Sequence, residues 1–186
     1  MANQPRPVKL TIEDYLLFPD DGKRHELIDG EHYVTPSPNT KHQRITRRLL
    51  TALDSFVTRR RLGEVFAAPY DVILSDVDVV EPDLVFVSAS RSALITEKNI
   101  QGVPDLVVEV LSEGTRKTDE TVKRKRYEHF GVPEYWIVDP ELETVKVYRM
   151  TDKGYVRAAE LAKEHNDILS SPLLPGLSLL LTEIFG

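Results

Sequence analysis

Two carboxylates that interrupt apolar segments are the residues best placed to do chemistry. Glu109 lies within the apolar run 106–111, and Asp83 opens the apolar run 84–87. A single acid of this kind is more often a structural charge with a cationic partner, because burying a carboxylate in a core strand costs free energy unless a cation pairs with it. If the two strands are neighbours, directly opposite side chains come within about 5 Å of each other. Two carboxylates that close repel unless a divalent cation or a lysine neutralises them.

Asp105 shares a strand face with Glu109, because side chains alternate along a strand. Four residues at about 3.3 Å each separate the two by about 13 Å, which is too far to share one small cation. Asp83, on its own apolar strand, is therefore the better partner for Glu109.

The helix expected after this strand carries a lysine on its apolar side. Val122, Tyr127 and Phe130 define an apolar arc at the helical period. Lys123 falls near the centre of that arc and is aimed at the sheet, whereas the two basic residues that follow it fall outside. A lone lysine in this position is more often one that extends its ammonium to solvent. A buried lysine needs an anion, and Glu109 or a substrate phosphate would serve.

Two further segments carry candidate polar groups. Glu26 belongs to a predicted hairpin over residues 25–34, in which an Asp-Gly pair favours a type I′ turn. A long helix is predicted over about 40–60, and His42 falls on its apolar stripe with Gln43 at the edge. Singly, a surface glutamate and a packing histidine are the commoner interpretations. Their expected convergence on one cleft favours a functional site.

The order of the predicted elements implies an α/β or α+β domain with a mixed central sheet. Residues 1–10 are polar and Pro-rich, which predicts a flexible N-terminal arm, and residues 11–186 are expected to form a single domain. Besides the elements above, the patterns predict a short helix over 11–18, strands over 64–67, 70–74, 145–148 and 155–156, and a polar turn over 75–80.

Composition and motifs exclude several classes of site. The 186 residues include no Cys, which removes thiolate and Cys-based metal chemistry and agrees with a cytoplasmic location. No apolar run approaches 18 residues and no leader is visible, so neither a membrane span nor a signal peptide is expected. The five His show no metal-binding spacing, and P-loop, dinucleotide and serine-elbow motifs do not occur.

Basic residues are concentrated in two predicted helices, although the formal net charge is −6. Residues 41–61 hold seven Lys and Arg against one Asp, and residues 116–126 hold six against two acids. Solvated helix faces commonly produce such runs. On an otherwise acidic chain, however, two basic helices could form a local phosphate-binding surface.

The candidate residues lie in sequence blocks that resemble a known family. These blocks are Glu81-Pro82-Asp83-Leu84, Pro104 to Ser112, Asp119-x-x-x-Lys123-x-x-x-Tyr127, and Gly131-Val132-Pro133-Glu134-Tyr135-Trp136-Ile137-Val138-Asp139. Over about residues 10–186, together with the hairpin at 25–31 and the ending at 174–177, the chain is similar to restriction-endonuclease-like proteins of the PD-(D/E)XK superfamily.

The resemblance implies a restriction-endonuclease-like fold, with a central mixed sheet flanked by helices, and magnesium-dependent cleavage of phosphodiester bonds. Asp83 matches the acid of the PD element, and Glu109 matches the first acid of the (D/E)XK element. The residue two positions after Glu109 is Leu111 instead of lysine. In this family the lysine has moved to the following helix, where Lys123 matches it, and Glu26 resembles an accessory carboxylate.

The resulting hypothesis is an endonuclease that cuts DNA. Asp83, Glu109 and Glu26 would hold Mg²⁺ or Mn²⁺, with Lys123 as the fourth catalytic residue, and the side chains expected to contact phosphate are His42, Gln43 and Arg116. Two alternatives stay open: a nuclease-fold binding or assembly module without turnover, which the acidic net charge and the missing in-strand lysine favour, and a phosphodiesterase that acts on RNA. A homodimer would supply the two sites that two cuts in a duplex require.

Overall fold

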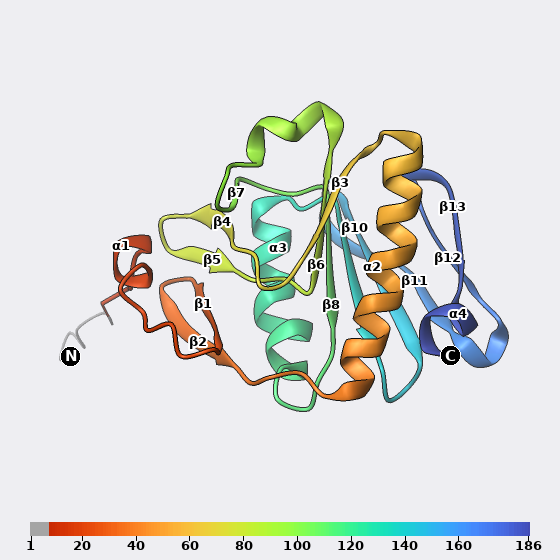
Figure 1. Ribbon diagram of the computed structural model, residues 1–186, viewed down its shortest axis with the longest axis horizontal. Helices are drawn as coiled ribbons and strands as arrows, with labels where there is room; N and C mark the ends of the chain where they lie inside the picture. Colours follow the sequence, from red (N-terminus) through yellow and green to blue (C-terminus); the bar gives the residue numbers. More distant parts are fainter. Residues whose placement is uncertain (1–7) are drawn as a thin grey trace.

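A six-stranded mixed sheet lies at the centre of the computed structural model, which describes residues 8–186 (Figure 1). In spatial order its strands are β11 (Gly154–Ala162), β10 (Thr144–Thr151), β9 (Glu134–Asp139), β8 (Leu106–Val110), β6 (Leu84–Ser88) and β3 (Gly63–Ala67). Strands β8 and β9 run parallel, and the other neighbours run antiparallel. The predicted mixed central sheet is therefore confirmed.

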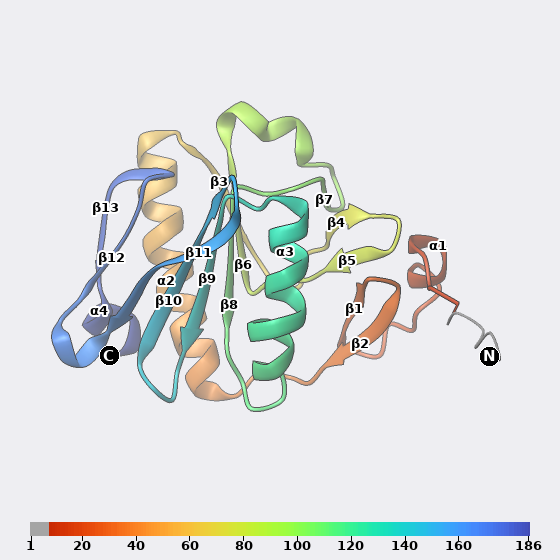
Figure 2. The same ribbon diagram turned by 180° about the vertical axis from the view of Figure 1, so that it is seen from behind.

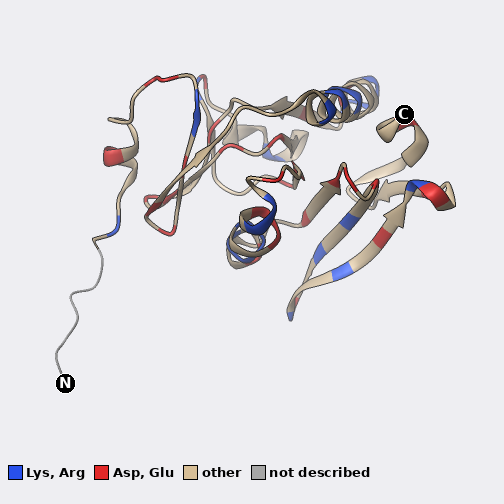
Figure 3. Cartoon of the chain, turned by 90° about the horizontal axis from the view of Figure 1, so that it is seen from below, with Lys and Arg blue, Asp and Glu red and all other residues tan. Residues whose placement is uncertain are grey.

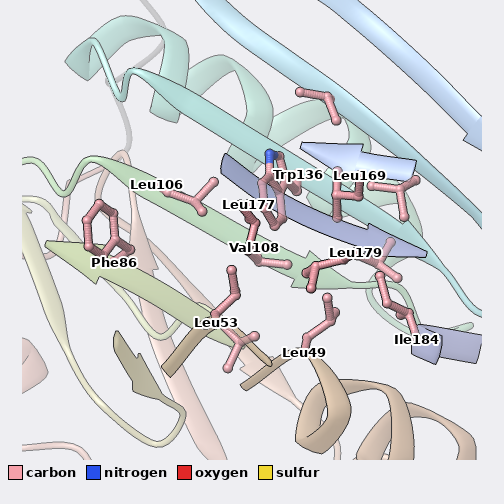
Figure 4. Packing of buried hydrophobic residues seen from close by; sticks show 14 of the residues in the cluster. Leu49, Leu53, Phe86, Leu106, Val108, Trp136, Leu169, Leu177, Leu179 and Ile184 are labelled. Carbon is pink, nitrogen blue, oxygen red and sulfur yellow. The ribbon is translucent and has the colours of Figure 1, made fainter. Parts of the chain in front are cut away.

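Helices cover both faces of this sheet (Figures 1 and 2). They are α2 (Thr40–Arg60) on one face and, on the other, a π-helical turn (Thr118–Lys123) that continues as α3 (Arg124–Phe130). Leu49 and Leu53 of α2 share a hydrophobic cluster with Leu106 and Val108 of β8 (Figure 4). Because side chains alternate along a strand, Glu109 faces the opposite side, toward α3.

A second sheet packs on the α3 side. Its spatial order is β2 (Glu31–Thr35), β1 (Arg24–Ile28), β5 (Asp78–Val80), β4 (Val72–Ser75) and β7 (Ile100–Gln101). The polar turn predicted over 75–80 is wrong, because residues 78–80 form strand β5, which is almost fully buried. Asp78 can lie inside because Arg126 Nε, at 2.8 Å, and the Asp29 N–H, at 2.8 Å, satisfy its carboxylate.

The remaining elements are short. They are α1 (Ile12–Tyr15), 3₁₀ turns at Ala89–Leu94 and Lys163–His165, strands β12 (Ile168–Ser171) and β13 (Leu174–Leu180), and α4 (Leu181–Phe185). The predicted arm over residues 1–10 lies mostly outside the described residues. Helix α1 is shorter than predicted, whereas β10 and β11 extend well beyond the predicted 145–148 and 155–156 because they pair along their full length. Within residues 8–186, no helix is long and apolar enough to cross a membrane.

Candidate active site

Strands β6 and β8 bring the two predicted carboxylates together. Leu84 pairs with Val108 in the antiparallel register, so Asp83 lies opposite Glu109 at the next position. The Asp83 N–H donates to Glu109 Oε2 at 3.4 Å, and the two residues are 4% and 2% exposed. The expected proximity of these acids is confirmed.

Lys123 meets these acids from the π-helical turn. Its Nζ lies 3.0 Å from Glu109 Oε1 and 2.8 Å from Glu26 Oε1. Asp119, four residues earlier on the same turn, places Oδ1 3.6 Å from this ammonium. The wide π turn therefore presents an acid and a lysine to the same side, and such turns are frequent at functional sites. The prediction that Lys123 points to the sheet and meets Glu109 is confirmed.

Glu26 reaches the same cluster from β1 and is only 2% exposed. Its Oε1 accepts a hydrogen bond from the Glu81 N–H at 2.9 Å, and Oε2 lies 3.4 Å from the Thr35 hydroxyl. Glu26 is therefore no surface residue of the hairpin. The hairpin carries it into the space between the two sheets, beside Lys123.

Asp83 is held by donors from three elements. Arg24 Nη1 of β1 donates to Oδ1 at 2.9 Å, and the Val110 N–H of β8 donates to Oδ2 at 2.8 Å. His42 Nε2, from the first turn of α2, lies 3.1 Å from Oδ2. The Asn39 side chain accepts a hydrogen bond from the His42 N–H at 2.9 Å and so caps α2, whose first turn contains this histidine.

The two carboxylates differ in proton affinity. Burial is the main cause that raises the pKa of Glu109 to about 8; Lys123 lowers it, and the neighbouring acids raise it. Burial alone would raise the pKa of Asp83, but its hydrogen-bond donors bring it below the ordinary value. Burial alone would lower the pKa of Lys123, but the three surrounding carboxylates raise it well above its usual range. Lys123 is therefore cationic and Asp83 anionic at neutral pH.

The site holds more buried acid than its cations neutralise. Besides Glu26, Asp83 and Glu109, two further acids, Glu81 and Asp119, are buried, and each keeps one oxygen without a hydrogen-bond partner. Clustered carboxylate oxygens are the hard donors that Mg²⁺ and Mn²⁺ prefer. Between residues 8 and 186, no three acidic or histidine side chains are arranged so that they could together hold a metal ion. A bound cation would have to replace contacts that the acids now make with the protein's own cations.

A cleft of about 420 Å³ opens onto Asp83. Its lining includes Lys23, Arg24, His42, Gln43, Thr46 and Asp83. Exposed Lys and Arg residues recur along α2 from this end, and the blue bands on its ribbon in Figure 3 mark the Lys and Arg positions. A larger groove of about 490 Å³ between α2 and β13 contains none of the predicted site residues. Of the acidic cluster, Asp83 and Glu81 line the cleft, and His42 and Gln43 line it from α2.

A family model described as putative restriction endonuclease, Uma2, matches residues 12–182 of the chain. The chain belongs to the Uma2 family. This membership confirms the resemblance drawn from the sequence blocks, and the match covers all the elements that build the acidic cluster. No protein of curated function matches the chain.

A solved structure shares the fold of this Uma2 protein. A putative nuclease belonging to DUF820 from Anabaena variabilis ATCC 29413 superposes with a TM-score of 0.76 at 22% identity, over 95% of this chain and 97% of that one. The match confirms the predicted fold class. The type IIG restriction endonuclease BpuSI superposes more weakly, with a TM-score of 0.40 and 15% identity, over 81% of this chain and 16% of that one.

Four side chains of the Uma2 site were not predicted as site residues. They are Arg24, Glu81, Asp119 and Tyr127, whose hydroxyl donates to Glu109 Oε1 at 3.0 Å. Extending the two-residue strand period back from Glu26 would have found Arg24. Asp119 and Tyr127 lie four residues before and after Lys123, a spacing that places side chains on one helix face.

Arg116 lies elsewhere, although it was predicted to contact phosphate. Its Nη1 and Nη2 donate to the Asp139 carboxylate at 2.5 and 2.9 Å, and it does not line the cleft. Burial opposes ionisation of Asp139, but this pair and two backbone N–H groups keep the pKa of Asp139 below its ordinary value. The structure thus places Arg116 as the partner of a strand-end carboxylate.

Replacing Arg116 with methionine should lower thermal stability and leave DNA affinity within about twofold of wild type. The charge-assisted pair is expected to contribute about 1.5–3 kcal/mol. Because the folded pKa of Asp139 is depressed, this contribution is present above its unfolded pKa and disappears as the pH falls through the folded value. Thermal unfolding at several pH values should show the two proteins converging below about pH 4. A large loss of DNA affinity with unchanged stability would instead support a phosphate contact.

Proposed function

We propose that this Uma2 protein is a metal-dependent endonuclease that hydrolyses phosphodiester bonds of DNA. The observation that carries the proposal is the meeting of Asp83, Glu109 and Glu26 with the buried Lys123 ammonium beside an open cleft. Family membership agrees with this interpretation. The three carboxylates would hold Mg²⁺ or Mn²⁺, which lowers the pKa of a bound water and offsets charge on the phosphate.

The protein's own side chains have separable roles in this proposal. Lys123 Nζ remains protonated, so it can orient the attacking water or donate to the phosphate oxygen where negative charge develops. The Tyr127 hydroxyl donates a hydrogen bond to Glu109 Oε1 and so holds that carboxylate in position. His42 and Gln43 lie in the cleft, where they would contact the backbone of the substrate.

One observation favours the alternative of a binding module without turnover. Both oxygens of Asp83 already accept hydrogen bonds from protein groups, which is a stable arrangement without a cation. In that case a nucleic acid would occupy the cleft and the acidic cluster would serve only to hold the two sheets together. The two functions differ in a measurable way, because only the nuclease requires a divalent cation.

A plasmid-nicking assay tests the proposal. Wild-type protein should convert supercoiled DNA to nicked and linear forms with Mg²⁺ or Mn²⁺ and should be inactive with a chelator. Glu109→Gln should abolish this conversion, because it removes a proposed metal ligand while keeping the size of the side chain. Asp105→Asn is the matched control, since Asp105 is a buried acid at the other end of the same strand, paired with Arg91.

Labelled RNA of the same sequence, assayed in parallel, separates a DNA substrate from an RNA substrate. Cleavage of RNA alone would support the second alternative. Wild-type protein that binds DNA and cleaves neither polymer with any divalent cation would support the binding module. Cleavage that persists in Glu109→Gln would remove the proposed site.

A further inference from the structure

We infer that Arg24 is a phosphate-binding residue of the cleft, held on Asp83 until a divalent cation takes that carboxylate and displaces it. The inference rests on the proposed function, because the cation and the phosphodiester are those of the nuclease reaction. It gives a role to a residue of β1 that no motif of the sequence marks.

Arg24 contacts the acidic cluster through one nitrogen. Its Nη1 lies 2.9 Å from Asp83 Oδ1 and 3.5 Å from the Glu81 carbonyl oxygen. A guanidinium carries five N–H donors, so these contacts leave Nε and Nη2 for other acceptors. The side chain is 19% exposed and lines the cleft of about 420 Å³. Arg24 is therefore both a partner of Asp83 and a donor that an incoming ligand can reach.

Asp83 does not depend on Arg24 alone. Its Oδ2 accepts from the Val110 N–H at 2.8 Å and lies 3.1 Å from His42 Nε2, whereas Arg24 contacts Oδ1. A divalent cation that binds Oδ1 would compete with Arg24 and leave the contacts to Oδ2 in place. Positive groups about 4 Å apart repel strongly in a partly buried site. Cation binding would therefore drive the guanidinium off the carboxylate.

A phosphate in the cleft provides the new acceptor. The planar guanidinium can donate two parallel hydrogen bonds to phosphate oxygens, which an ammonium cannot do. His42 and Gln43 line the same cleft from α2, so a phosphate there would contact Arg24 of β1 and these two residues of α2. Strand β1 can remain paired with β2 and β5 while the Arg24 side chain changes rotamer. Cation loading would thus prepare the cleft for the substrate.

A second arginine–aspartate pair, at the other end of β8, serves as a structural comparison. Arg91 Nη1 lies 3.1 Å from Asp105 Oδ1, and its Nη2 donates to the Val103 carbonyl oxygen at 2.5 Å. Both terminal nitrogens of Arg91 are therefore engaged by the protein, and neither Arg91 nor Asp105 lines the cleft. Removing Arg91 should cost stability without affecting cation or DNA binding.

Calorimetry with Mn²⁺ and fluorescence anisotropy with a short DNA duplex in Ca²⁺ test the inference on the full chain. Arg24→Met should bind Mn²⁺ about tenfold more tightly, because a competing positive charge is gone. It should bind the duplex about tenfold more weakly, because a phosphate contact is lost. Arg24→Lys should keep wild-type Mn²⁺ affinity and lose part of the DNA affinity. Arg91→Met should leave both affinities unchanged.

The outcomes separate this inference from the proposed function. If wild type binds Mn²⁺ and Arg24→Met binds it equally or more weakly, the displacement of Arg24 is overturned and the nuclease proposal stands. If neither wild type nor any variant binds Mn²⁺, both are overturned. Thermal unfolding without metal reveals whether Arg24→Met is folded. If Arg24→Met does not fold, Arg24→Lys tests the inference instead, because unchanged DNA affinity in that variant would contradict a bidentate phosphate contact of Arg24.

Discussion

Replacing Lys123 with methionine should slow DNA cleavage by about 10²–10³-fold, the loss typical of removing one donor that stabilises transition-state charge. Methionine keeps the apolar stem of the side chain and removes the ammonium. That ammonium lies 2.8 Å from Glu26 and 3.0 Å from Glu109, so no other group can take its position without rebuilding the cluster. Nicking rates at saturating Mg²⁺ measure the effect, and Lys125→Met is the control, because Lys125 is exposed on the same helix.

The same substitution should also make stability depend on pH. Without Lys123, the buried acids Glu26, Glu109 and Asp119 lose their shared cation, and the folded pKa values of Glu109 and Asp119, which burial already raises, rise further above the unfolded values. An acid with a raised folded pKa stabilises the fold at low pH, and this stabilisation is lost as the pH rises through the folded value. The melting temperature of Lys123→Met should therefore fall below wild type by more at pH 8 than at pH 6.

A double substitution distinguishes the lost charge pair from lost packing. Removing one partner of a buried pair costs about 3–5 kcal/mol, largely because the other charge is left unpaired. Lys123→Met combined with Glu109→Gln should therefore be more stable than Lys123→Met alone at pH 8. A double variant less stable than either single variant, or nicking activity that survives in Lys123→Met, would contradict the role given to this lysine.

The positions of Glu109, Asp83 and Lys123 could be predicted because each is a polar residue at an apolar position. Strand alternation and the helical period fix the face of each side chain, and two buried acids with one buried lysine have few ways to satisfy one another. Glu26 was a weaker prediction, because its burial depends on how the hairpin docks against β5. No local pattern encodes that docking.

Arg24 and β5 were missed for a related reason. Each depends on a polar partner distant in the sequence: Arg24 on Asp83, and Asp78 of β5 on Arg126. From the sequence alone a charged residue is expected on the surface, but it can be buried when such a partner is present.

The π-helical turn was also missed, because its hydrogen bonds shift by one residue from those of an α-helix while the sequence period stays nearly the same. Arg116 shows the reverse case, since a basic residue expected to contact phosphate is paired with Asp139 and lies outside the cleft.

Asp83→Asn should abolish the stabilisation of the protein by Mg²⁺. A cation that binds only the folded state stabilises it by about 2.7 kcal/mol at one hundred times its dissociation constant. For a chain of this length, that corresponds to a rise in melting temperature of about 5–10 °C. Asparagine keeps the shape of the side chain but removes the charge that pairs with Arg24 and that a cation would need. Thermal unfolding with and without Mg²⁺ measures the difference.

The result of this measurement decides whether the acidic cluster is a cation site or only a structural one. Asp105→Asn should retain the full Mg²⁺-dependent rise, because Asp105 is satisfied by Arg91 and the Ser88 N–H far from the cleft. If wild type shows no rise with Mg²⁺ or Mn²⁺, the contacts of Asp83 with Arg24 and His42 are the working state of the protein, and the binding module becomes the better account. If the rise persists in Asp83→Asn, the cation binds through other acids, of which Glu81 and Asp119, each with one oxygen that accepts no hydrogen bond, are the first to replace.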